Sequence, residues 1–339
     1  MDPDSIERAG RVPHGSSDRP GVLDLSANIN PRVPEGTHAV YQSAFDAADS
    51  YPNDGYPEFR AAAAEYVGCD PESVIPTAGG LAAIRLAIGV TVSPGDSVLV
   101  PTPSFSEYAR EVKLAGGEPE IVPHDELLDC DPSDHAMAIV CNPNNPTGEC
   151  YPTTALKAFA DRCDDSETTL LADEAFLGFT DRLSVAGHPA VIVARSLTKL
   201  FGLPGLRAGF AIAEGSRYDR LSTARLTWSL SGPAAAVGTY AMTDSAFVHE
   251  TRRRVECERQ FLIEGLQSRG FDVAPSDAPF VLCDVGEPPE HLLSACRKHD
   301  VVLRDATTFR ELDSHVRIAV RDRDATERLF SVLDEVWVR

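Results

Sequence analysis

The chain has 339 residues, which is long enough for a large domain with a substantial core and a smaller second domain. Its 52 acidic residues outnumber its 31 basic ones and give a net charge of −21, so nucleic acid and anionic membrane surfaces are excluded as partners. No apolar run is long enough to span a bilayer, and none of the eight cysteines forms a Cys-x-x-Cys pair. We therefore expect a cytoplasmic protein with reduced thiols and no metal centre.

Arginine predominates among the basic residues. Only four of the 31 are lysines, and the rest are arginines. An acidic excess with so few lysines predicts a halophilic protein, in which high salt screens the repulsion between surface carboxylates.

Short apolar runs alternate with helical stretches between about residues 75 and 212. Alternation of this kind is typical of βαβ units, so we expect an α/β fold with a mostly parallel sheet and helices on both faces. Ligands bind beyond the carboxyl ends of the strands in such sheets. The pattern predicts helices at 81–90 and 106–116, strands at 97–100, 118–122, 137–141, 169–173 and 191–195, and a further apolar run at 207–213.

The pattern changes after Pro233 to a mixture typical of a separate α+β domain. Residues 1–45 have little periodicity and are expected to pack against it. We therefore divide the chain into a large domain, 46–240, and a small domain formed by 1–45 and 241–339. The elements expected in the second part are a long helix over 234–269, a strand at 279–285, a helix at 291–299, strands at 301–304 and 315–320, and a helix at 326–336.

Two charged residues follow predicted strands. Lys199 lies just beyond the strand 191–195, among Ser196, Thr198 and Arg207. A lysine in that setting is either a carbonyl-binding amine beside a phosphate pocket or a solvated loop residue. Asp173 ends the strand 169–173, where a buried carboxylate needs a cationic partner unless it caps a helix.

Two predicted turns are further candidates for ligand binding. Residues 142–148, with the sequence NPNNPTG, close the strand 137–141, and their prolines fix a turn that can aim asparagine amides into the crevice. Residues 77–81, with the sequence TAGGL, open the helix 81–90. The backbone N–H groups at such a helix start can bind an anion.

In order, spacing and sequence, these four segments resemble the fold-type I pyridoxal-phosphate enzymes of the aminotransferase class I/II family, over nearly the whole chain. The resemblance implies pyridoxal 5′-phosphate as cofactor, linked covalently to Lys199, with Asp173 holding its pyridine nitrogen protonated. It implies that Asn145 bonds the phenolic oxygen, that Phe105 stacks on the ring, and that Tyr51 reaches the phosphate of the other subunit of a homodimer. The implied phosphate ligands within the subunit are Gly80, Leu81, Ser196, Thr198 and Arg207.

One residue departs from the family pattern. Many relatives carry a tyrosine where Phe176 stands, and that tyrosine donates a second hydrogen bond to the phenolic oxygen. Phenylalanine cannot donate, so we expect different ring electronics here.

The substrate is suggested by both ends of the chain. Arg317 matches the family's carboxylate-binding arginine, and Arg304 lies in the preceding predicted strand, where it either binds substrate or pairs with a nearby aspartate. The string SANINP at 26–31, after His14-Gly15, resembles the L-threonine-O-3-phosphate decarboxylases of cobalamin biosynthesis, as does DEAF at 173–176. That resemblance implies that His14 and Asn28 also contact a small phosphorylated amino acid. Ser16 departs from the second glycine of that group.

Three functions remain open. The first is decarboxylation of L-threonine O-3-phosphate to (R)-1-aminopropan-2-yl phosphate. The second is transamination, as in the sister group of histidinol-phosphate aminotransferases, which would consume 2-oxoglutarate instead of releasing CO₂. The third is a binding protein without turnover, which the joint presence of Lys199, Asp173, Asn145 and Arg207 disfavours.

Overall fold

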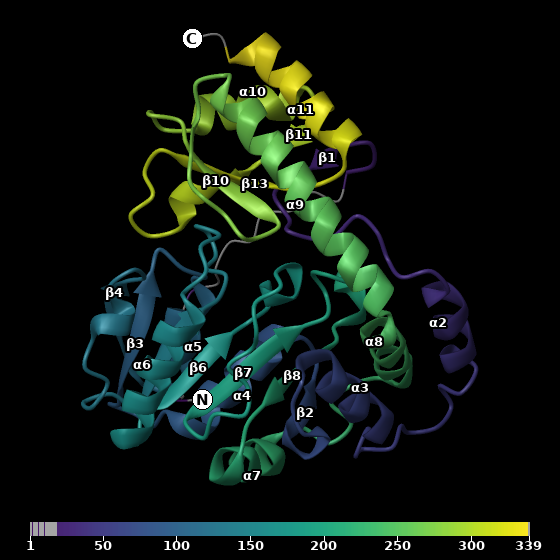
Figure 1. Cartoon of the computed structure of the whole chain (residues 1–339), viewed down its shortest axis with the longest axis vertical. Helices are drawn as coiled ribbons and strands as arrows, with labels where there is room; N and C mark the ends of the chain where they lie inside the picture. The colour runs from purple at the N-terminus through teal and green to yellow at the C-terminus, as the bar shows by residue number, and fades with distance from the viewer. Residues whose placement is uncertain (1, 3–5, 7–9, 11–18, 338–339) are drawn as a thin grey trace.

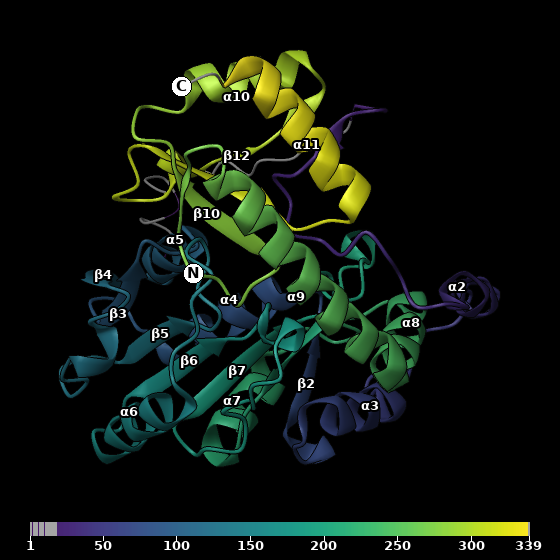
Figure 2. The ribbon, with the colours of Figure 1, turned by 45° about the horizontal axis from the view of Figure 1, so that its top comes forward.

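The computed structural model describes residues 2, 6, 10 and 19–337. His14 therefore lies outside the described residues. A large sheet with its helices forms one part of the molecule, and a smaller sheet with α10 and α11 forms the other (Figure 1). Helix α9 runs between the two parts. The turned view in Figure 2 shows the smaller part standing over one end of the large sheet.

The large sheet has seven strands in the order β2-β8-β7-β6-β5-β3-β4. Strand β8 is antiparallel to both of its neighbours, and the other neighbouring pairs are parallel. The prediction of a mostly parallel sheet is confirmed, and β5 and β6 have the predicted bounds. The strands are β2 (Val74–Thr77), β3 (Ser97–Thr102), β4 (Glu118–Pro123), β5 (Met137–Cys141), β6 (Thr169–Asp173), β7 (Val191–Ser196) and β8 (Gly209–Ile212).

Helices cover both faces of this sheet, as predicted. Adjacent residues Leu170 and Leu171 of β6 are both fully buried, yet they belong to two separate apolar clusters. One cluster includes side chains of α3, α6 and α8, and the other includes side chains of α4, α5 and α7. The continuous apolar runs of the strands thus supply one buried side chain to each face in turn. The bounds are α3 (Pro57–Val67), α4 (Gly80–Thr91), α5 (Glu107–Ala115), α6 (Thr153–Asp165) and α7 (Gly215–Ala224).

The smaller sheet is antiparallel, in the order β12-β13-β10-β9. The strand expected at 301–304 is two strands, because β11 pairs with the N-terminal β1 while β12 pairs with β13. The chain passes from one pairing to the other at the buried Leu303. The bounds are β1 (Leu23–Asp24), β9 (Asp272–Val273), β10 (Phe280–Asp284), α10 (Glu290–Lys298), β11 (Val301–Val302), β12 (Arg304–Asp305), β13 (His315–Ala319) and α11 (Arg323–Val336).

The single helix expected over 234–269 is wrong. The structure has α8 (Gly232–Thr243) and α9 (Ser245–Gln267), separated by Asp244. Asp244 leaves the helical conformation at φ −83° and ψ 75°, and its carboxylate accepts a hydrogen bond of 2.9 Å from the backbone N–H of Phe247. It therefore caps a new helix rather than continuing the old one.

The N-terminal segment contains a helix that its weak periodicity did not indicate, α2 (Thr37–Phe45). This helix packs beside α8 (Figures 1 and 2). The division of the chain at residues 45 and 240 stays a prediction. Short 3₁₀ turns occur at Pro71–Ser73, Leu127–Asp129, Leu177–Phe179, Pro204–Leu206 and Ala306–Thr308. Among the described residues, no helix is both long and apolar enough to cross a membrane.

Candidate active site

A cavity of about 260 Å³ lies where the carboxyl ends of the large sheet meet the smaller sheet. Its lining brings together side chains from three distant parts of the chain: the segment after β1, the loops after β3, β5, β6 and β7, and the strands β12 and β13. The predicted site residues that line it are Asn28, Phe105, Asn145, Lys199, Arg304 and Arg317.

Lys199 follows β7 by three residues. Burial, together with the positive charges of Arg317 and Arg207, lowers the pKa of its amine from 10.5 to about 8, against the opposing attraction of Asp173. Within the described part of the chain, the amine donates no hydrogen bond and forms no ion pair. It lies 5.9 Å from the centre of the Phe176 ring. The amine is therefore free to react, and the lowered pKa raises its neutral, nucleophilic fraction.

Asp173 is the last residue of β6 and is only 6% exposed. Burial raises the pKa of its carboxyl, while two donors oppose that shift: the Tyr108 hydroxyl at 2.6 Å and the backbone N–H of Ala175 at 3.0 Å. Sequence reasoning missed Tyr108, which reaches Asp173 from α5. The available signal was a tyrosine three residues after Phe105 in a predicted helix, because a buried phenol needs a hydrogen-bond partner.

The start of α4 meets the end of β7. Gly79 has φ +94°, and a Cβ atom there would lie 2.7 Å from Arg207 Nη2. A Cβ atom on Gly80 would lie 3.1 Å from the Cβ atom of Ser196. The hydroxyls of Ser196 and Thr198 are 2.8 Å apart.

This junction, which we call the anion cradle, consists of Gly79, Gly80, Leu81, Ser196, Thr198 and Arg207. The N–H groups of Gly80 and Leu81 are in the first turn of α4 and have no acceptor within the helix. The two neighbouring hydroxyls adjoin Gly80 through Ser196, and the Arg207 guanidinium adjoins Gly79. The cradle therefore offers the hydrogen-bond donors and the positive charge that a phosphate group requires.

Arg304 and Arg317 are direct partners in the β12–β13 pairing. Arg317 is 7% exposed; its guanidinium donates to Asn145 Oδ1 and, at 2.9 Å, to the carbonyl of Ser26. Burial and the charge of Arg304 lower the pKa of Arg317 from its ordinary value. Two adjacent guanidinium groups repel one another, so a bound anion would stabilise both.

Asn28, Phe176 and Tyr51 were also singled out in the sequence, and they lie in different surroundings. Asn28 is 3% exposed, and its Oδ1 atom has no hydrogen-bond partner among the described residues. Phe176 packs edge-on against Phe280 with ring centres 5.1 Å apart, and it brings no donor to the cavity. Tyr51 does not line the cavity. Its side chain is 78% exposed and its ring stacks on Trp228.

The family model of aminotransferase class I and II matches residues 20–333. The chain belongs to this family. It is 31% identical over 283 residues to the histidinol-phosphate aminotransferase of Leuconostoc mesenteroides, covering 78% of each chain. It is 31% identical over 333 residues to a provisionally named threonine-phosphate decarboxylase of Caldanaerobacter subterraneus, covering 91% of this chain and 88% of the relative.

Among solved structures, the histidinol-phosphate aminotransferase of Sinorhizobium meliloti, determined with pyridoxal 5′-phosphate, superposes with a TM-score of 0.85 at 21% identity. The alignment covers 93% of this chain and 90% of that one. The expected fold is thereby confirmed. The cofactor of the family is pyridoxal 5′-phosphate, also as expected.

The described residues of this family member fit that cofactor. An unpartnered amine, an anion cradle at a helix start and a buried carboxylate are the three groups that its aldehyde, its phosphate and its ring nitrogen require. The orphaned oxygen of Asn28 marks a polar position that the protein alone does not satisfy. No group of three potential metal ligands occurs within the described part of the chain.

Proposed function

We propose that the protein decarboxylates L-threonine O-3-phosphate to (R)-1-aminopropan-2-yl phosphate. The observation that carries this proposal is the pair Arg304 and Arg317, which face one another across two strands beside the unpartnered amine of Lys199. The proposed substrate has two anionic groups, a carboxylate and a phosphate, and each can be held by one guanidinium. Histidinol phosphate has a phosphate but no carboxylate.

Asp173 and Tyr108 would help the cofactor ring to accept electrons from the substrate. Bound pyridoxal phosphate supplies a conjugated ring that accepts the electron pair left on Cα when CO₂ departs. The Asp173 carboxylate would keep the ring nitrogen protonated, and the resulting opposite charge would compensate the burial that raises its pKa. The Tyr108 hydroxyl holds that carboxylate in place through its 2.6 Å hydrogen bond.

Lys199 would act twice. Its amine, whose pKa is lowered to about 8, would hold the cofactor covalently while the site contains no substrate. Once CO₂ has left, Lys199 can deliver to Cα the proton that replaces the lost carboxylate. The arginines orient the substrate so that the Cα–carboxylate bond, rather than Cα–H, is the one that breaks.

Transamination is the second candidate, favoured by the 31% identity to a histidinol-phosphate aminotransferase. In that reaction the same lysine would remove the Cα proton, and Arg317 would bind the carboxylate of the keto-acid partner. The two reactions differ in which bond of the substrate Arg304 and Arg317 present to the ring.

We further propose a homodimer in which Tyr51 completes the phosphate site of the other subunit. The support is its position: Tyr51 lies outside the cavity of its own subunit and is 78% exposed. A closed two-fold dimer would carry two such exchanges.

The deciding assay uses protein reconstituted with pyridoxal phosphate. Release of CO₂ from L-threonine O-3-phosphate without added keto acid is expected. Formation of glutamate from histidinol phosphate and 2-oxoglutarate, with no CO₂, would instead establish the aminotransferase. Arg317→Gln and Arg304→Gln should each lower kcat/KM about 10- to 100-fold through the loss of charge-assisted hydrogen bonds. Arg310→Gln, an exposed arginine near the cavity, is the matched control.

A further inference from the structure

Tyr51 and Trp228 form an exposed aromatic pair. Their ring centres are 4.2 Å apart and the rings are inclined by 19°. Trp228 is 46% exposed, and the Tyr51 hydroxyl has no hydrogen-bond partner within the described chain. A solvent-exposed tyrosine ordinarily samples several rotamers, so a flat aromatic support restricts it before any ligand arrives.

The loops that carry the pair are joined by a salt bridge. Both carboxylate oxygens of Asp54 accept hydrogen bonds from the Arg225 guanidinium, at 3.0 and 2.8 Å. The same carboxylate accepts the backbone N–H of Trp228 at 2.6 Å. Arg225 lowers the pKa of Asp54, so the carboxylate is charged at neutral pH. Trp228 has φ +54°, a conformation that costs energy in a non-glycine residue and that this contact helps to maintain. We call Asp54, Arg225 and Trp228 the Tyr51 clamp.

The clamp is also fixed to the anion cradle of its own subunit. The Ser229 hydroxyl donates to the carbonyl of Pro76 in β2, at 2.9 Å. Strand β2 leads directly into the Gly79-Gly80 turn. The Tyr56 hydroxyl donates to the carbonyl of Leu230 at 2.8 Å and lies 3.1 Å from its N–H group. Hydrogen bonds therefore join the two loops, and the strand that leads into the cradle, into one connected unit.

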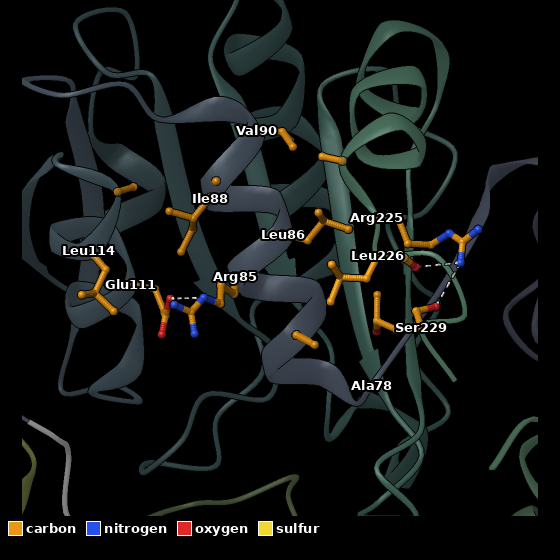
Figure 3. A pocket seen from close by; sticks show the side chains of 15 residues that line it. Ala78, Arg85, Leu86, Ile88, Val90, Glu111, Leu114, Arg225, Leu226 and Ser229 are labelled. Carbon is orange, nitrogen blue, oxygen red and sulfur yellow. Dashed lines mark hydrogen bonds and ion pairs between the residues drawn. The ribbon is translucent and has the colours of Figure 1, made fainter. Parts of the chain in front are cut away.

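An apolar hollow borders this unit. Leu226 is 80% exposed, and it lines a cavity of about 350 Å³ together with Leu86 and Val90 of α4 (Figure 3). In Figure 3 the Leu226 side chain points toward α4, whereas the Arg225 side chain points away from that helix. A contiguous exposed apolar surface marks an interaction site. Leu226 lies two residues before Trp228 in the chain, so a second copy of this chain that receives Tyr51 would also approach this cavity.

We propose that the Tyr51 clamp is a positioning device that acts in the site of the partner subunit. Trp228, held by Asp54 and Arg225, fixes the Tyr51 ring so that its hydroxyl enters the anion cradle of the second copy. This inference rests on the proposed homodimer and does not depend on which substrate is used. Removing the clamp leaves Tyr51 present but unrestrained, and the partner's hold on the cofactor phosphate weakens.

Hybrid dimers test whether the clamp acts on the site of the partner subunit or on the site of its own subunit. Trp228→Ala alone should raise the dissociation constant for pyridoxal phosphate about tenfold, equivalent to 1.4 kcal/mol. In a hybrid of Trp228→Ala with Lys199→Ala, the subunit that keeps Lys199 receives Tyr51 from an intact clamp. One native site per hybrid should therefore return, seen as cofactor that stays covalently attached after borohydride reduction.

The reverse mixture gives the opposite expectation. When wild-type chains are mixed with the double variant Lys199→Ala, Trp228→Ala, the Lys199 of each hybrid receives Tyr51 from a broken clamp. Its cofactor affinity should match that of Trp228→Ala. If the first hybrid stays weak and the second stays native, the clamp acts within its own subunit and the proposal is overturned.

Conservative variants separate positioning from folding. Trp228→Phe keeps an aromatic support and should restore most of the affinity, while Asp54→Asn should weaken it. Asp334→Asn is the matched control, because Arg269 and Asp334 form a similar two-bond pair, at 2.7 and 2.8 Å, on the smaller part of the molecule. An equal loss of affinity in Asp334→Asn would show a general stability effect and contradict the clamp.

Fluorescence gives a readout without cofactor or substrate. Trp228 and Trp337 are the two tryptophans of the chain, so Trp337→Phe isolates Trp228. Its emission should shift to shorter wavelength as protein concentration rises and the pair is buried by the second copy. Sedimentation of the same samples reports the oligomer directly. A monomer at all concentrations would overturn both the dimer and the clamp. A dimer without the emission shift would overturn the clamp alone. Absence of CO₂ release would leave both standing and remove only the proposed substrate.

Discussion

The position of Lys199 has two opposing effects on its amine. Its amine must be buried to lie against the cofactor, yet burial disfavours its charged form and, together with nearby positive charges, lowers its pKa to about 8. Arg317, which would bind the substrate, and Arg207 of the anion cradle disfavour the charged amine by repulsion. The protein without cofactor therefore holds a destabilising charge at neutral pH, and covalent attachment of the cofactor would relieve it.

Replacing Lys199 by methionine should stabilise the cofactor-free protein at pH 7. Below about pH 8 both the folded and the unfolded chain carry the charge, so the folded state bears its full burial cost. Between about pH 8 and 10.5 the folded protein loses the proton before the unfolded chain does, and the cost fades. Urea unfolding of Lys199→Met and wild type across pH 7 to 10.5 should show a gap that closes. Lys298→Met, an exposed lysine of α10, is the control. Equal stabilities at pH 7 would contradict the buried charge.

Some site residues could be predicted from the sequence because they follow strands of one parallel sheet. Lys199 and Asn145 follow β7 and β5, whose carboxyl ends necessarily meet at the same edge. Tyr108 and Trp228 could not be predicted in the same way. Their partners, Asp173 and Tyr51, belong to other elements, and only the packed arrangement of helices and loops brings them together.

The start of α4 is the element whose backbone the site depends on most. Gly79 has φ +94° and ψ 167°, which only glycine adopts readily, and it packs directly against Arg207. The sequence showed the two glycines, but it could not show that Arg207 and Ser196 approach them so closely.

Gly79→Ala should therefore lower the free energy of unfolding by about 1–3 kcal/mol and also weaken binding of pyridoxal phosphate. Gly89 lies near the other end of the same helix, is exposed, and has no atom within 4 Å of an added Cβ. Gly89→Ala should instead stabilise the helix by up to about 1 kcal/mol with unchanged cofactor affinity. Denaturant unfolding and cofactor titration on both variants test this pair. A similar response of the two variants would show that the turn has no special role.

Helices and strands could be predicted where the apolar pattern was strong. The prediction failed where a capping hydrogen bond or the pairing of distant strands determines where an element begins and ends. Strands β5 and β6 are short apolar runs with clear ends, and their bounds matched. The break at Asp244 interrupts a continuous helical pattern, and only the capping hydrogen bond reveals it. Strands β11 and β12 are adjacent in sequence but pair with β1 and β13 respectively, which no local pattern specifies.

At the scale of the whole molecule, the net charge of −21 opposes compaction. Raising KCl from 0.1 to 2 M should therefore raise the thermal midpoint, on the order of 5 °C, because screening weakens the repulsion in the folded state. Sucrose solutions of the same water activity are the control, because sucrose stabilises proteins by being excluded from their surface but does not screen charge. The salt effect should diminish near pH 5, where carboxylates begin to be protonated. A midpoint independent of KCl at pH 7 would contradict the predicted adaptation to salt.

The pairing of the first strand with a late one has a consequence for the order of assembly. Ser26, after β1, accepts a hydrogen bond from Arg317, which lies 291 residues further along the chain. During synthesis the large sheet is complete once β8 has emerged, because all seven of its strands lie before residue 213. The N-terminal segment with Asn28 must wait for β11 and β13. Loop closure over that distance makes it a late folding event. The substrate pocket is thus the last part of the molecule to form, and a chain released early can acquire Lys199 and its cradle without the arginines that would choose a substrate.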